Sequence, residues 1–202
     1  MTTDPSDRPR ILVAGVGNIF LGDDAFGVEV AQRLARRQLP SGVRVVDFGI
    51  RGLDLAYALL DPFEAVVLVD AMPRGGRPGT LYVLEPEPGP DPPATEGAPL
   101  MVPHGMDPAR VLRLVAALGG KVRRLLVVGC EPGTCGGEED ALAGMSAPVR
   151  AAVDEAVLLV ESLVARLLCP AEGTGTAAAL GCEENTIPGK EVRTCQPLDQ
   201  KS

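Results

Sequence analysis

Three side chains in this 202-residue chain are of types that bind transition metals: Asp24, Asp70 and His104. Asp24 follows an apolar segment and a Gly-x-Gly-Asn turn, Asp70 ends a second apolar segment, and His104 is the only histidine. Two carboxylates and one imidazole form a site for a divalent transition metal, with coordination positions open for water or substrate. Such an ion acts as a Lewis acid on a bound substrate or lowers the pKa of a bound water.

Each of these residues also has a structural interpretation. Asp23 and Asp24 stand where a helix is expected to begin, and the helix dipole favours acids there, so Asp23 acts either as a base or as a helix cap. An Asp at the end of a strand often caps the following loop. A single His beside Pro103 and Gly105 is often only a solvated loop residue.

Strands and helices that alternate along the sequence are predicted to position these side chains. Strands are predicted at residues 11–16, 43–47, 65–69, 80–84 and 125–128, and helices at 26–38, 53–60, 108–118 and 147–168. This order predicts an α/β three-layer sandwich, with a largely parallel twisted sheet of about five strands and helices on both faces. Ligands bind outside the carboxyl ends of the strands in such sheets, which is where Asp24 and Asp70 stand.

The remaining organisation follows from composition. Residues 10–168 are predicted to form one domain, and residues 170–202, rich in Gly, Thr and Ala, a flexible C-terminal tail. Seven prolines between positions 85 and 103 exclude regular structure there. Asp107 and Pro108 supply the cap and first residue of the next helix, and Ser146 caps the last one.

Charge and cysteine content narrow the class of protein. The net charge of −8 argues against a nucleic-acid or anionic-membrane partner. The polar N-terminus and the lack of a long uncharged apolar run predict a cytoplasmic protein, and we expect a monomer. Five cysteines at irregular spacing predict free thiols, with a Cys130/Cys135 metal pair as the alternative. No Gly-x-Ser-x-Gly motif indicates a serine nucleophile.

Several motifs resemble those of the hydrogenase maturation proteases, endopeptidases that trim the C-terminus of the nickel–iron hydrogenase large subunit. The segment Gly15-Val-Gly-Asn…Gly22-Asp-Asp-Ala-Phe-Gly-Val28 resembles the opening signature of that family, Val66-Val-Leu-Val-Asp70 its second acidic motif, and Pro103-His104 its histidine motif. Val128-Gly-Cys-Glu-Pro132 and Met145-Ser-Ala-Pro-Val149 are similar to later segments. The resemblance covers about residues 10–168.

The resemblance implies a function and a set of site residues. Asp24, Asp70 and His104 become the catalytic and metal-binding trio, which engages nickel already present in the large-subunit precursor. Another divalent metal such as zinc is expected as the alternative occupant in the isolated protein. The substrate peptide is predicted to contact a second set of residues: Gly17, Asn18, Asp23, Gly49 and Gly52. The segment 47–52 is less rich in Gly and Thr than the family pattern, and the tail after Cys169 has no counterpart.

Two other functions remain open. A non-catalytic metallochaperone or precursor-binding protein would use the same trio without cleavage. A nucleotide-binding oxidoreductase is suggested by Gly15-x-Gly17 after a strand, with Asp47 on a ribose. However, Phe20 occupies the third glycine position of that motif, and Asp47 stands about 30 residues after the turn where about 20 are typical.

Overall fold

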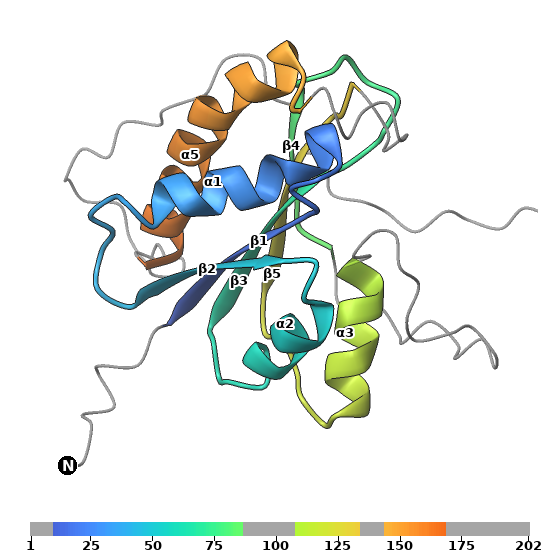
Figure 1. Ribbon diagram of the computed structural model, residues 1–202. Helices are drawn as coiled ribbons and strands as arrows, with labels where there is room; N and C mark the ends of the chain where they lie inside the picture. Colours follow the sequence, from blue (N-terminus) through green and yellow to red (C-terminus); the bar gives the residue numbers. More distant parts are fainter. Residues whose placement is uncertain (1–9, 87–107, 134–143, 169–202) are drawn as a thin grey trace, which may run out of the picture.

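A single five-stranded sheet runs through the molecule in the order β2-β1-β3-β5-β4 (Figure 1). The structure is a computed structural model, and it describes residues 10–86, 108–133 and 144–168. The strands are β1 (Ile11–Val16), β2 (Val43–Gly49), β3 (Ala65–Ala71), β4 (Leu81–Leu84) and β5 (Leu125–Cys130). β2, β1, β3 and β5 are parallel and β4 is antiparallel to β5, which confirms the largely parallel sheet.

Helices cover both faces of this sheet. A single 3-10 turn, η2 (Gly22–Ala25), leads into α1 (Phe26–Leu34), and the other helices are α2 (Gly52–Ala58), α3 (Pro108–Ala117) and α5 (Ala147–Leu168). Figure 1 shows α1 and α5 on one face and α2 and α3 on the other. Each face buries its own apolar cluster, so the predicted three-layer sandwich is confirmed.

The central strands follow the burial expected for a parallel sheet. Every residue of β1 and β5 is buried, because helices pack on both sides of them. The edge strand β2 is mostly half-buried. The valine stripe predicted for the last helix also faces the core, since Val149, Val153, Val157, Val160 and Val164 are all buried.

Two glycines bring α1 unusually close to the sheet. A Cβ on Gly15 of β1 would stand 2.3 Å from the Gly27 carbonyl oxygen and 2.5 Å from Cβ of Ala31. A Cβ on Gly27 would stand 2.1 Å from the carbonyl oxygen of Val69 in β3 and 2.3 Å from that of Val16. The start of α1 is therefore seated on the carboxyl ends of β1 and β3.

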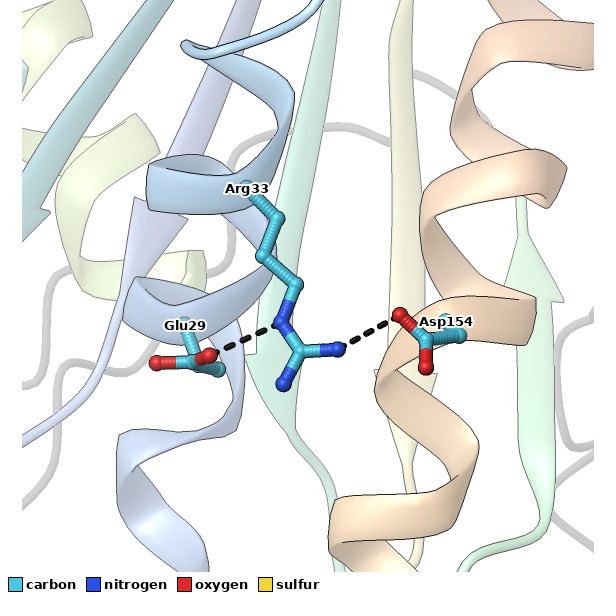
Figure 2. A network of polar contacts seen from close by, with 3 residues as sticks. All are labelled: Glu29, Arg33 and Asp154. Atoms are coloured by element: carbon cyan, nitrogen blue, oxygen red, sulfur yellow. Dashed lines mark hydrogen bonds and ion pairs between the residues drawn. The ribbon is translucent and has the colours of Figure 1, made fainter.

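A polar network ties α1 to α5 at the surface. Arg33 donates to Glu29 on its own helix at 2.8 Å and to Asp154 of α5 at 2.5 Å (Figure 2). Exposed ion pairs of this kind contribute little stability each, about 0–1 kcal/mol. The buried apolar cluster beneath them therefore dominates the packing of these two helices.

Some boundaries differ from the sequence-based prediction. The helix predicted to reach residue 38 ends at Leu34, because the N–H groups of Arg36 and Arg37 bond to carbonyls three residues back. β5 extends two residues further than predicted, because Cys130 pairs with both Ala71 and Leu81.

No helix in the described ranges is long and apolar enough to cross a membrane. His104, Asp107, the proline-rich stretch after residue 86 and the predicted tail lie outside the described residues.

Candidate active site

The turn after β1 folds back so that its own backbone holds Asp24. Gly17 has φ of 132°, and a Cβ at this position would stand 1.8 Å from the carbonyl oxygen of Asp24, so only glycine fits here. The N–H of Asn18 then donates to Oδ2 of Asp24 at 2.6 Å. The Asn18 side chain closes the turn by accepting the N–H of Phe20 at 3.0 Å. Asp24 is half-buried and held in one orientation.

Asp70 lies near the carboxyl end of β3, directly beside β1. Its exposed fraction is 9%, and it faces Gly129 in the register of β5. Burial and, after it, the charge of Asp24 together raise the pKa of Asp70 to about 8, although the hydrogen bond from the N–H of Ala71 opposes this shift. Because the charge of Asp24 acts on Asp70, the two carboxylates are neighbours at this end of the sheet, and their sharing of one metal ion stays a prediction.

The two carboxylates form an acidic pair without a positive partner in the described part of the chain. No Lys or Arg among residues 10–86, 108–133 and 144–168 forms an ion pair with either. Carboxylates arranged in this way share a proton or bind a cation. Within these ranges no three His, Cys, Asp or Glu side chains are grouped to hold a metal. Because His104 is not among them, its convergence on the pair stays a prediction.

Asp23 does not cap α1, which corrects one of its two predicted interpretations. The acids lie in η2, and Ala25 at the N-cap of α1 makes no side-chain hydrogen bond. The Asp23 carboxylate is fully buried and accepts the N–H of Gly133 at 2.7 Å and the N–H of Ser146 at 2.6 Å. The Ser146 hydroxyl donates to it at 2.9 Å. Asp23 therefore joins η2 to the start of α5, and its predicted contact with substrate is untested.

The loop after β2 approaches the same turn. The N–H of Gly17 donates to the carbonyl oxygen of Gly49 at 3.1 Å, and Gly49 itself has φ of 53°. Gly52 begins α2 three residues later. The Arg51 guanidinium donates to the carbonyl oxygens of Asp47 and Phe48, which closes the loop on itself. Gly17, Asn18 and Gly49 are thus neighbours beside Asp24, whereas their contact with substrate stays a prediction.

Glu131 is a polar residue near this edge of the sheet that is not among the site residues predicted from the sequence. Its carboxylate is 4% exposed and accepts the N–H groups of Arg74 and Gly75 at 2.9–3.0 Å and the hydroxyl of Tyr82 at 2.7 Å. Burial alone would raise the pKa of Glu131, but these hydrogen bonds outweigh it and hold the pKa below its ordinary value. An acid directly after the buried β5 was the signal, the same one that identified Asp70.

Cys130 is excluded as a nucleophile by its surroundings. The side chain is fully buried at the end of β5. Burial, together with the charges of Asp23 and Glu131, raises the pKa of the Cys130 thiol to about 12. The thiolate, which is the reactive and metal-binding form, is therefore suppressed at neutral pH. Cys135, its partner in the alternative metal pair, lies outside the described residues.

Comparison with known proteins points in one direction. A sequence model of the hydrogenase maturation protease family matches residues 28–163. The chain is 32% identical over 193 residues to the hydrogenase expression/formation protein HupM of Azotobacter chroococcum mcd 1. The aligned region covers 91% of this chain and 89% of HupM.

Solved structures agree with the sequence relatives. The hydrogenase maturating endopeptidase HybD from Escherichia coli superposes with a TM-score of 0.59 at 27% identity, covering 78% of this chain and 93% of HybD. The [NiFe] hydrogenase maturation protease HycI from Thermococcus kodakarensis KOD1 superposes with a TM-score of 0.53 at 27% identity. The superposition covers 79% of this chain and 95% of HycI.

Proposed function

The chain belongs to the family of hydrogenase maturation proteases, and we propose that it removes the C-terminal propeptide of a nickel–iron hydrogenase large-subunit precursor. The proposed reaction follows nickel insertion, and the metal in the precursor is the feature that the enzyme recognises. The family is one of peptidases, so peptide-bond hydrolysis is the expected chemistry. The precursor, the timing and the metal dependence are parts of the proposal.

The acidic pair Asp24 and Asp70 is the observation that carries this proposal. A carboxylate with 9% exposure next to a second carboxylate is unfavourable unless a proton or a cation joins the pair. Oxygen ligands from two carboxylates, together with the imidazole of His104, suit nickel and equally suit zinc. The donor set therefore fits a divalent transition metal. Nickel enters with the substrate in this proposal, and zinc is the alternative occupant of the isolated protein.

The protein's own residues have defined tasks in the proposed reaction. Asn18 holds the Asp24 carboxylate through its N–H, and Asp70 approaches from β3. Asp24, Asp70 and His104 together would hold the ion and fix the peptide beside it. The bound ion supplies Lewis acidity to the scissile carbonyl or to a water. Orientation of this kind contributes as much as about 7–11 kcal/mol to lowering a barrier in favourable intramolecular cases.

A cleavage time course tests the function. Precursor purified with nickel and precursor purified without nickel are each incubated with enzyme stripped of metal, and the released peptide is followed by mass spectrometry. We expect cleavage only of the nickel-loaded precursor. Equal rates on both would contradict nickel recognition, and no cleavage of either would favour a metallochaperone. His104→Ala should abolish cleavage while the melting temperature stays within a few degrees.

The dinucleotide-binding alternative has weaker support than the peptidase. The backbone of Asp24 fills the space beside Gly17, and η2 separates the turn from α1. A phosphate site needs a glycine turn that opens directly onto a helix N-terminus. The Asp47 carboxylate, the candidate ribose ligand, accepts the side-chain amide of Gln32 at 3.0 Å.

We also propose a cytoplasmic location and a monomeric state. Five cysteines, an odd number, are typical of a chain that keeps free thiols in a reducing compartment. Cys130, the cysteine among the described residues, is a free thiol. Sedimentation of the purified protein would test the monomeric state.

A further inference from the structure

Large apolar side chains are exposed along two segments that leave neighbouring strands. Among the described residues, five of the eight large apolar side chains that are exposed lie on these segments. They are Ile19 (59%), Phe20 (72%), Ile50 (71%), Leu53 (55%) and Tyr57 (55%), and we call them the apolar rim. Clustered exposed apolar residues mark interaction sites far more often than scattered ones.

The backbone explains why these segments are adjacent. β1 and β2 are paired in parallel, with Val16 opposite Gly49, so both chains leave the sheet at the same edge. The Gly17 N–H to Gly49 carbonyl bond at 3.1 Å extends this pairing one step beyond β1. Ile19 and Phe20 follow on one side of the bond and Ile50 on the other.

The first helix after β2 continues the rim. Leu53 and Tyr57 are four residues apart on α2, so they share one side of the helix. Leu55 and Ala56, which are fully buried, and Leu59 supply the contacts of α2 with the core. Leu53 and Tyr57 are therefore apolar residues that the packing of the fold does not use.

The rim is continuous with the candidate active site. Ile19 and Phe20 directly follow Asn18, whose N–H holds Asp24 at 2.6 Å. The N–H of Phe20 bonds to the Asn18 side chain, so the position of the rim backbone depends on the same turn. A polypeptide bound at Asp24 is therefore within a few residues of Ile19 and Phe20.

We propose that the apolar rim is the docking surface for an apolar segment of the precursor polypeptide next to its scissile bond. This inference rests on the proposed function, since the occupant is the protein substrate. When the substrate covers Phe20 and Ile50, burial of these side chains contributes binding free energy that the acidic pair alone does not give. The rim sets the affinity for substrate and leaves the bond-breaking step to Asp24 and Asp70.

The experiment compares rim variants with a matched control. Phe20→Ser combined with Ile50→Ser removes the two most exposed rim side chains. Leu158→Ser changes an apolar residue of similar exposure, 58%, on α5, which covers the other face of the sheet from α2 (Figure 1). KM for the nickel-loaded precursor should rise at least tenfold in the rim variant, while kcat stays within twofold. Both constants should stay within twofold in the control.

Further measurements separate the possible failures. Phe20→Leu combined with Ile50→Val should restore KM, because apolar area is kept. If the wild-type enzyme cleaves precursor and the rim variant has an unchanged KM, the docking surface is wrong and the proposed function stands. If the wild type fails to cleave, precursor binding is measured directly: rim-dependent affinity would support the surface and reject the protease function. A concentration-dependent dimer that the rim variant abolishes would assign the surface to a second copy of the chain and overturn the inference.

Discussion

Ser146 donates both its N–H and its hydroxyl to the buried carboxylate of Asp23, although 123 positions separate the two residues. The N–H of Gly133 donates to the same carboxylate. Asp23 is also the residue directly before Asp24, so this junction fixes the backbone that presents Asp24. The start of α5 thereby helps to position Asp24 indirectly, through its hydrogen bonds to Asp23.

Removing the Asp23 carboxylate should cost more stability than removing the Ser146 hydroxyl. Asp23→Ala removes the buried carboxylate that accepts the N–H groups of Gly133 and Ser146, and we expect a loss of about 3 kcal/mol. Ser146→Ala removes one hydrogen bond and keeps the N–H contact, so a loss of about 1 kcal/mol is expected. Urea unfolding measures the free energy of unfolding of each variant against that of the wild type. Equal losses in the two variants would show that the carboxylate is not the centre of the junction.

Asp70→Asn should stabilise the protein at alkaline pH. The pKa of Asp70 is raised from 3.8 to about 8 by burial and by the charge of Asp24, so the folded state binds one more proton than the unfolded chain between these values. The contribution of Asp70 to stability is therefore fully present below about pH 4 and is lost as pH rises towards 8, by at most about 1.4 kcal/mol per pH unit.

The Asn side chain cannot ionise, so this pH dependence disappears in the variant. Urea unfolding at a series of pH values should show the two proteins alike in acid, with the variant increasingly more stable as pH approaches 8. A constant difference over the whole range would contradict the raised pKa of Asp70. The variant should also lose cleavage activity.

Asp24→Asn should lower the pKa of Asp70. The negative charge of Asp24 is the second cause that raises this pKa, after burial, and the amide removes it while keeping a similar shape. The variant pKa should stay above the ordinary Asp value, because the burial of Asp70 is unchanged. Carbon NMR titration of labelled Asp carboxyl groups follows the change. An unaltered Asp70 titration would mean that the two carboxylates are not coupled.

Cys130 should resist alkylation in the native protein. Burial, followed by the charges of Asp23 and Glu131, raises its pKa to about 12, so it offers almost no thiolate at pH 8. Iodoacetamide treatment followed by peptide mass spectrometry should find the Cys130 peptide unmodified. The same treatment in concentrated urea serves as the control and should modify it. Rapid native alkylation would show that the end of β5 opens readily.

Local sequence signals were sufficient to predict the strands and helices, and to predict that Asp24 and Asp70 follow the carboxyl ends of two strands. The uninterrupted apolar run of β3 placed Asp70 at the edge of the sheet, and the valine periodicity of α5 identified its buried face. The Gly-x-Gly turn marked a backbone that no larger residue fits, which the φ of Gly17 confirms. These features depend on neighbours within a few residues, and a sequence displays them directly.

Tertiary structure decided which distant groups meet. The donors to Asp23 lie 110 and 123 positions away, and the acceptor of the Arg74 and Gly75 N–H groups, Glu131, lies 57 and 56 positions away. No local pattern encodes such contacts, because they depend on strand order and on where each crossover returns to the sheet. The exposed apolar rim likewise emerges only when β1 and β2 are paired side by side, since hydrophobicity in a sequence does not distinguish a buried side chain from one left facing solvent.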